Sequence, residues 1–197
     1  DSRAAQPADH PLPVNPSDQL VTLIGGSGFI GRHMVRALAK RGYRIRVACR
    51  RPDLAGHLQP LGVPGQIVTV QANVRYPASL AAACQGAHAV VYLPSTFNEK
   101  LYEATNVFGA QAAAKAARAA GAALFLQVSA AGADAQGLSA YSRTKARGEA
   151  AARVAFPGAI MLRPSIVFGP EDGFFNKFAG MARLSPFLPL IGGGETR

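Results

Sequence analysis

Cysteine, long hydrophobic runs and acidic side chains are all scarce in this sequence. Its 197 residues include two cysteines, Cys49 and Cys84, and four histidines, none of which has metal-ligand spacing. We expect both cysteines to be buried, reduced thiols, which suits a reducing compartment. No apolar run approaches the roughly 18 residues of a membrane-spanning helix. The sequence therefore indicates neither a metal site nor a transmembrane segment, and no Ser/His/Asp hydrolase arrangement is evident.

The shortage of acidic residues leaves a strongly basic chain. Lysine and arginine number 21 against 11 aspartates and glutamates, which gives a net charge of +10 and an isoelectric point near 10.3. Such a balance fits a nucleic acid, an acidic membrane surface, an acidic partner or an anionic cofactor. The arginines are scattered, without a basic stripe interleaved with aromatics, which argues against nucleic acid. A docking surface for an anionic partner or membrane fits better.

Strand and helix patterns alternate along the chain, and the 49% hydrophobic content suits one domain with a sizeable core. We expect strands at Leu20–Ile24, Arg44–Cys49, Gln66–Gln71, Ala87–Leu93, Ala123–Val128 and Ala159–Leu162. We expect helices at Phe29–Arg41, Pro77–Gln85, Glu99–Ala120 and Ser139–Ala155. This order predicts an α/β fold with a doubly wound parallel sheet of the Rossmann type and right-handed crossovers.

The two ends of the chain differ from the middle. Residues 1–19 hold four prolines and no apolar periodicity, which predicts an extended N-terminal arm. Because the first residue is aspartate rather than methionine, we expect a processed or trimmed chain. Residues 20–163 are expected to form the nucleotide-binding domain. Residues 164–197, rich in proline and glycine with one helical pattern at Phe174–Arg183, indicate the start of a truncated second lobe on the substrate side.

A glycine-rich turn joins the first strand to the first helix. In a βαβ unit Gly25 would permit the tight turn, Gly28 would let the backbone approach a pyrophosphate, and Gly31 would let the helix pack closely. The helix N-terminus then presents N–H groups to the anion. The alternative is a tight strand–helix turn that binds nothing. The cofactor-binding residues expected here are Gly25, Ser27, Gly28, Phe29, Ile30 and Gly31.

Arg50 and Arg51 follow the second strand, about twenty residues after the turn, where an acidic residue commonly binds the ribose hydroxyls of NAD. Guanidinium groups match the geometry of a 2′-phosphate, so the pair predicts NADP(H) rather than NAD(H). The alternative is two solvated surface charges. Asn73 and Val74 follow the third strand and would meet the adenine edge, unless they form an ordinary strand-end turn.

The end of the fourth strand contributes Leu93 and Pro94, which we also assign to the cofactor site.

A tyrosine and a lysine lie four residues apart on a predicted helix, at Tyr141 and Lys145, and so share one face. A nearby cation lowers the pKa of a phenol toward the range of a general acid or base. Lys145 could also reach the nicotinamide ribose hydroxyls. Ser129 ends the fifth strand, at the edge of the sheet where it could hydrogen-bond a substrate carbonyl. Asn106 is either a fourth site residue or a polar residue on a helix side.

Together with Asn106-Val-x-Gly109 and Arg163-Pro164-Ser-x-Val-x-Gly169, these motifs resemble the extended short-chain dehydrogenases/reductases over residues 20–170. The resemblance implies a Rossmann fold and adds Arg163 and Pro164 to the cofactor site. It places four residues in the family's active-site positions: Asn106, Ser129, Tyr141 and Lys145.

A narrower resemblance extends from Val21 to about Gly194. The segments 57–66 and 168–183, the second containing Glu171-Asp172-x-Phe, are similar to the NADPH-binding accessory subunits of respiratory complex I, NADH:ubiquinone oxidoreductase. This implies a tightly held NADPH away from the main electron path, and a structural role where the peripheral and membrane arms join. The implied partners are other complex I subunits and anionic lipid.

The same resemblance implies a location on the matrix side of the mitochondrial inner membrane, or on the cytoplasmic face of a bacterial membrane. The basic charge and the apolar segment Phe187–Ile191 would fit docking at such a junction; the alternative for that segment is ordinary core of the second lobe.

Two departures from the dehydrogenase pattern argue against turnover. Eleven residues separate Ser129 from Tyr141, fewer than in most extended enzymes, and the family's chain continues past Arg197. Without a complete lobe, water would enter the site. The sequence therefore predicts a non-catalytic, NADPH-binding accessory subunit of complex I. The alternatives are a free-standing NADP(H)-dependent reductase or epimerase, and a nucleotide-sensing regulator without chemistry.

Overall fold

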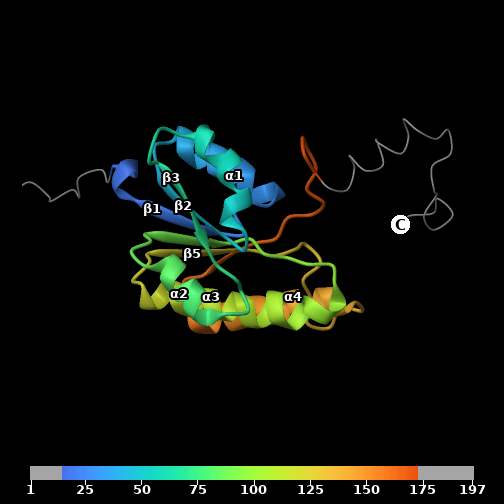
Figure 1. Ribbon diagram of the computed structural model, residues 1–197. Coiled ribbons are helices and arrows are strands. Elements are labelled where there is room, and N and C mark those ends of the chain that lie inside the picture. Colours follow the sequence, from blue (N-terminus) through green and yellow to red (C-terminus); the bar gives the residue numbers. More distant parts are fainter. Residues whose placement is uncertain (1–14, 173–197) are drawn as a thin grey trace, which may run out of the picture.

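The computed structural model describes residues 15–172 and contains one six-stranded parallel sheet (Figure 1). The strand order is β3-β2-β1-β4-β5-β6. Successive strands are added outward on one side from β1 to β3 and on the other side from β4 to β6, so the switch point lies between β1 and β4. The strands are β1 (Leu20–Ile24), β2 (Arg44–Cys49), β3 (Ile67–Gln71), β4 (Ala89–Tyr92), β5 (Leu124–Val128) and β6 (Ile160–Leu162). Every pair is parallel, so the predicted doubly wound sheet is confirmed.

Helices cover both faces of the sheet. Figure 1 shows α1 on one face, and α2, α3 and α4 together on the other. The α-helices are α1 (Phe29–Lys40), α2 (Pro77–Cys84), α3 (Ala110–Ala119) and α4 (Ala140–Ala155). Short 3₁₀ turns are η1 (Pro16–Asp18), η2 (Pro52–Leu54), η3 (Gly56–Leu61) and η4 (Glu99–Leu101), and η5 (Glu103–Gly109) is a π-helix.

The hydrophobic core has two parts because successive side chains of a strand point to opposite faces. Leu23 packs with Val35 of α1 on one face, whereas Ile24 packs with Phe125 on the other. The second part is rich in alanine, because α3 buries five alanines that allow close approach to α2, α4 and the sheet. Burial of apolar surface on both faces of the central strands is what holds the layers together.

Both cysteines are buried and unpaired, as predicted, and they lie in different parts of the core. Burial raises the pKa of Cys84 to about 11, although the charge of Arg46 opposes this shift. A thiol with so high a pKa is protonated at neutral pH and therefore weakly nucleophilic. Cys84 is thus a core residue rather than a reactive one.

The single helix expected over Glu99–Ala120 was wrong in detail. The segment is divided into η4, the π-helix η5 and α3. The hydroxyl of Tyr92 donates to the Thr105 carbonyl at 2.6 Å, and in an α-helix that carbonyl would accept from the N–H of Gly109. Insertion of a side chain into the hydrogen-bond ladder is a usual cause of such a local change.

The ends of the chain are partly outside the described residues. Of the predicted arm, residues 15–19 are described, and Pro16–Asp18 forms a 3₁₀ turn instead of extended chain because Asn15 caps it. The helix expected at Phe174–Arg183, the apolar segment Phe187–Ile191 and most of the expected second lobe lie outside residues 15–172.

Because all six strands are parallel, their carboxyl ends meet at one edge of the sheet. That edge gathers the predicted site residues from segments far apart in the sequence. Gly25, Arg50, Leu93, Ser129 and Arg163 come directly after their strands, and Asn73 comes two residues after the end of β3.

Candidate functional site

The glycine turn has the geometry of a tight strand–helix connection. Gly25 has a φ of 78°, which favours glycine, and its N–H donates to the Ala48 carbonyl at 2.8 Å. A Cβ at Gly25 would lie 3.2 Å from the ring of Pro94, and the N–H of Leu93 donates to the carbonyl of Ile24. Leu93 and Pro94 therefore border the glycine turn, and a side chain at Gly25 would disturb it; contact of these two residues with a cofactor stays a prediction.

The start of α1 lies directly against the turn. A Cβ at Gly31 would overlap the backbone of Gly26, so only glycine allows this packing. Gly28 is the N-cap and contributes no side-chain hydrogen bond, and a Cβ there would meet one atom, the Gly25 carbonyl oxygen at 3.3 Å. The first-turn amides of Phe29 and Ile30 have no preceding helical carbonyl to bind. These groups fit an anion at the helix N-terminus.

The two arginines after β2 have different surroundings. Arg51 forms a forked hydrogen bond to Asp53, with Nε–Oδ1 at 3.0 Å and Nη2–Oδ2 at 2.7 Å. This contact lowers the pKa of Asp53. In the described part of the chain Arg50 is exposed and forms no ion pair. Sequence reasoning missed Asp53, which occupies the fork of Arg51 and leaves Arg50 as the better phosphate ligand.

Asn73 builds the turn between β3 and α2. Its Oδ1 accepts from the N–H of Arg75 at 3.1 Å, and its own N–H donates to the Ser79 hydroxyl at 3.0 Å. Val74 is half-buried and approaches Gly109 of η5. These contacts match the strand-end turn that the sequence left open as an alternative. A contact from Asn73 or Val74 to adenine stays a prediction.

Tyr141 and Lys145 share one face of α4, as their spacing predicted. The Nζ atom of Lys145 lies 5.8 Å from the ring centroid of Tyr141. The Tyr141 hydroxyl lies 3.4 Å from the Ser95 hydroxyl, in the loop after β4. Sequence reasoning missed Ser95, although its position just after a strand at the carboxyl edge was a usable signal.

Lys145 is 2% exposed, which is unusual for a lysine. Burial lowers the pKa of Lys145 to about 8, while the negative charge of Glu149 acts in the opposite direction. Loss of hydration disfavours the ammonium form, and a nearby carboxylate favours it. The amine of Lys145 is therefore half-protonated at about pH 8, so it titrates in mildly alkaline solution.

Two aromatic rings pack against Tyr141. Phe97 stacks on it with ring centroids 5.7 Å apart and planes 25° apart, and Tyr102 contacts it edge-on, also at 5.7 Å. Phe97 is itself 88% exposed, and Tyr141 is half-buried. Residues of the β4–η5 connection therefore cover part of the Tyr141 ring.

Asn106 is buried in η5 and contacts α4. Its Nδ2 donates to the Thr144 hydroxyl at 3.1 Å, which in turn donates to the Tyr141 carbonyl at 3.0 Å. Its Oδ1 is buried without a hydrogen-bond partner among the described residues. A Cβ at Gly148 would overlap the Asn106 carbonyl, so glycine permits the close contact of η5 and α4. The structure therefore brings Asn106 to the Tyr141–Lys145 segment.

Ser129 and Arg163 meet at a residue that sequence reasoning missed, Glu149. Arg163 donates Nε to Oε1 at 2.9 Å and Nη2 to Oε2 at 2.6 Å. The Ser129 hydroxyl is buried close to the same carboxylate, outside ideal hydrogen-bond geometry. Burial alone would raise the pKa of Glu149, but Arg163 and Ser129, with the charge of Arg153, outweigh it and lower the pKa. Glu149 lies four residues after Lys145 on the same predicted helix, and this spacing could have indicated that the two side chains are neighbours.

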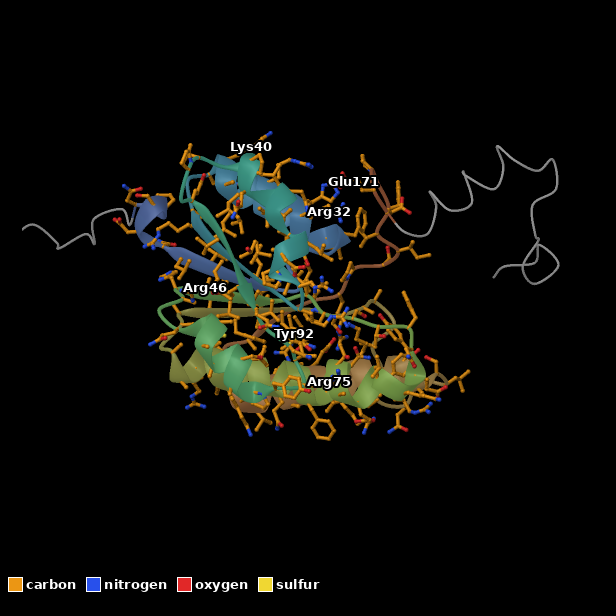
Figure 2. The ribbon with its side chains drawn as sticks, viewed as in Figure 1. Arg32, Lys40, Arg46, Arg75, Tyr92 and Glu171 are labelled. Atoms are coloured by element: carbon orange, nitrogen blue, oxygen red, sulfur yellow. The ribbon has the colours of Figure 1, made fainter. Side chains whose placement is uncertain are left out.

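The segment after β6 returns to α1. Figure 2 shows Glu171 beside Arg32 at the end of α1, and the two form an ion pair at 3.1 Å. Pro170 contributes its carbonyl to His33 Nε2 at 3.3 Å. Glu171 has a φ of 72°, a left-handed conformation that is uncommon outside glycine. At the start of this segment the carbonyl of Pro164 accepts from the N–H of Ala131. From there the segment reaches the start of α1, which is the predicted phosphate end of the site.

Residues 15–172 hold neither a candidate metal cluster nor a candidate membrane-spanning helix. No group of three or more His, Cys, Asp or Glu side chains gathers as a metal site there. None of the helices in that part of the chain is both long and apolar enough to cross a membrane.

A glycine turn, a helix N-terminus and a buried lysine at the carboxyl edge of a doubly wound sheet define a dinucleotide-binding protein. Residues 25–155 match the family described as NAD(P)H-binding, and the chain belongs to that family. The fold is also that of a UDP-glucuronic acid 4-epimerase from Bacillus cereus, solved in complex with NAD. That structure has a TM-score of 0.67 at 21% identity, and the match covers 84% of this chain and 64% of the other.

The curated relatives are of two kinds. A ceramide reductase of Caulobacter vibrioides is 36% identical over 175 residues, which is 87% of this chain and 54% of the relative. A mitochondrial NADH dehydrogenase (ubiquinone) 1 alpha subcomplex subunit 9 of Arabidopsis thaliana is 33% identical over 183 residues, 90% of this chain and 46% of the relative. The similarity to complex I subunits expected from the sequence is confirmed, and the chain spans about half the length of these relatives.

Proposed function

We propose that this chain is the nucleotide-binding part of an accessory subunit of respiratory complex I, which holds NADPH without turning it over. Its similarity to complex I subunits supports the assignment. The single observation that carries the absence of turnover is the contact of the Tyr141 ring with Phe97 and Tyr102, with its hydroxyl directed to Ser95 at 3.4 Å. A phenol that serves as a general acid must instead reach a substrate oxygen.

The residues of the site fit a dinucleotide. The open side of Gly28 and the first-turn amides of α1 would take the pyrophosphate. The ammonium of Lys145 would bind ribose hydroxyls. Asn106 Oδ1 and Ser129 Oγ are buried without a hydrogen-bond partner among the described residues, so both have capacity to bind a ligand. Arg50 would take the 2′-phosphate that distinguishes NADPH from NADH.

The proposed partners are other complex I subunits where the peripheral and membrane arms join, on the matrix side of the mitochondrial inner membrane. The net charge of +10 supports contact with an acidic partner and with anionic lipid at that junction. The subunit would stabilise the junction by binding to its neighbours and would catalyse no reaction there.

Gentle isolation from native membranes tests this proposal. The protein would be denatured after purification, and both the released nucleotide and the co-purifying chains identified. We expect NADPH together with respiratory-chain subunits. A lone protein whose nucleotide exchanges rapidly with added NADP⁺ would contradict the proposal.

A second candidate is a working NADP(H)-dependent reductase. It is favoured by the convergence of Asn106, Ser129, Tyr141 and Lys145 and by the similarity to a ceramide reductase. Tyr141 would then protonate a substrate oxygen and Ser129 would orient the carbonyl. When bound, NADPH would supply the hydride.

The variant Tyr141→Phe separates the two candidates. A reductase would lose most of its turnover with ketone substrates while NADPH binding is kept, and Tyr76→Phe, at an exposed tyrosine, would have no effect. Absence of turnover in the wild-type protein with a broad panel of ketones, including ketone-bearing lipids, would leave the accessory role as the better account.

A further inference from the structure

Glu149 is a buried carboxylate that connects three residues of the predicted site. It is 4% exposed, and Arg163 holds it through hydrogen bonds at 2.9 and 2.6 Å. The Ser129 hydroxyl lies close to it, and Lys145 precedes it by one helical turn on the same face of α4. Glu149 itself was not among the residues predicted from the sequence to bind the dinucleotide.

The charges around Lys145 come from two elements. On α4 they are Tyr141 and Glu149, with Arg153 acting on the carboxylate from one turn further on. The segment after β6 contributes Arg163. Of these groups, the one charge that favours the ammonium form is that of Glu149.

The other elements packed against α4 bring no charge to the buried lysine. From η5 the neutral amide of Asn106 hydrogen-bonds to Thr144, the residue before Lys145, whereas Glu103 pairs with Arg147 on the exposed side of α4. On α3, Lys115 and Arg118 are exposed, and Arg118 donates to the Ala155 carbonyl at the far end of α4.

A purely structural ion pair does not explain the position of Glu149. Removing a carboxylate from water costs several kcal/mol, which a single pairing often fails to recover. Arg163 is half-exposed and could pair with an acid at the surface at lower cost. Lys145, by contrast, is 2% exposed and needs a buried opposite charge to remain an ammonium ion.

We infer that Glu149 is a positioning residue for Lys145: its carboxylate, held by Arg163, keeps the ammonium charged and over the Tyr141 ring, ready for the ribose hydroxyls of a dinucleotide. The identity of that ligand rests on the proposed function. The positioning of Lys145 does not, because it is a property of the protein without cofactor.

The first test measures the titration of Lys145 itself. The chain has five lysines, so protein labelled with ¹³C at lysine Cε gives few NMR signals, and Lys145→Met identifies the one that matters. In the wild-type protein this signal should titrate with a pKa of about 8. Glu149→Gln should move the midpoint down by about one pH unit, and Glu149→Asp should restore part of the shift.

A matched control comes from another acidic residue that contacts α4. Glu103→Gln removes an exposed ion pair to Arg147 on the same helix and should leave the midpoint unchanged. If Glu149→Gln does not fold, Glu149→Asp still tests the inference, because it keeps the charge but draws it back toward the helix backbone and should lower the midpoint by a fraction of a unit.

An unchanged midpoint in folded Glu149→Gln, or in Glu149→Asp where Glu149→Gln does not fold, would overturn the inference. A second readout is the affinity for NADPH, measured as a function of pH. As the pH is raised, this affinity should begin to fall at a lower pH in Glu149→Gln than in the wild type. If the wild-type protein binds no NADPH, the proposed function fails while the NMR titration still decides the role of Glu149.

Discussion

At the residue scale, burial decides what the polar side chains of the site do. Lys145 and Glu149 are both nearly inaccessible; Lys145 depends on the charge of Glu149 one turn along α4, and Glu149 on the charge of Arg163 after β6. Tyr141 was expected as an acid–base group, yet Phe97 and Tyr102 pack against its ring. The residue types were recognisable from sequence, but their surroundings were not.

The lowered pKa of Lys145 makes a prediction about stability. Between about pH 8 and pH 10.5 the unfolded chain holds a proton that the folded chain has released, so the free energy of unfolding contributed by this group rises with pH across that window. The integrated difference is about 3 kcal/mol. Lys145→Met should remove this rise. The measurement is urea unfolding at several pH values for both proteins, and parallel pH profiles would contradict the prediction.

Gly25 makes a second residue-scale prediction. An alanine there must adopt a φ of 78° at a cost of about 1–2 kcal/mol, and its methyl group would press on Pro94. Gly86→Ala is the control, because Gly86 has a φ of 67° with nothing within 4 Å of an added Cβ. In calorimetric titrations Gly25→Ala should weaken NADPH binding and Gly86→Ala should not. Equal affinities would exclude the turn from the site.

At the scale of elements, the connection from β4 to α3 is where local preference and tertiary structure disagree. The alanine-rich composition of Glu99–Ala120 predicted one helix, but the segment begins with η4 and η5. Tyr92 on β4 donates a hydrogen bond to the carbonyl of Thr105 within this segment, a contact that composition does not encode. Figure 2 shows Tyr92 between the sheet and the helices of the second layer. The resulting π-helix is the element that carries Asn106.

Tyr92→Phe tests this account. Loss of the hydrogen bond to the Thr105 carbonyl should cost about 1–2 kcal/mol of unfolding free energy. Hydrogen exchange should quicken in Glu103–Gly109 more than in α4. Tyr76→Phe, at a tyrosine that is 62% exposed, is the control. An unchanged exchange pattern in η5 would show that the hydroxyl does not maintain the π-helix.

At the scale of the whole molecule, the excess of positive charge is the property most relevant to partners. Lysine and arginine exceed acidic residues by ten, and the basic side chains are spread along the chain. Attraction between exposed charges is screened by salt, with a Debye length of about 30 Å at 0.01 M and about 3 Å at 1 M. Contact with an anionic surface should therefore depend strongly on ionic strength.

Co-sedimentation with vesicles measures this dependence. We expect binding to vesicles that contain anionic lipid at low salt, loss of that binding near 1 M salt, and little binding to neutral phosphatidylcholine vesicles at either salt concentration. Binding that persists at high salt would indicate apolar insertion instead of an electrostatic contact.

The sequence by itself determined the order of elements, the parallel sheet and the glycine turn. Element bounds agree within one or two residues for all six strands, because period, glycine position and strand-forming residues act locally. The shared face of Tyr141 and Lys145 also followed from helix geometry alone.

The environment of those residues, by contrast, depends on tertiary contacts. The carboxylate of Glu149 meets Arg163 from the segment after β6, and the hydroxyl of Tyr141 meets Ser95 from the loop after β4. Burial, pKa shifts and buried polar atoms without partners depend on such contacts between different elements, 14 and 46 residues apart in these two cases, which no local pattern encodes. The parallel sheet creates these contacts because it brings every strand's carboxyl end to one edge.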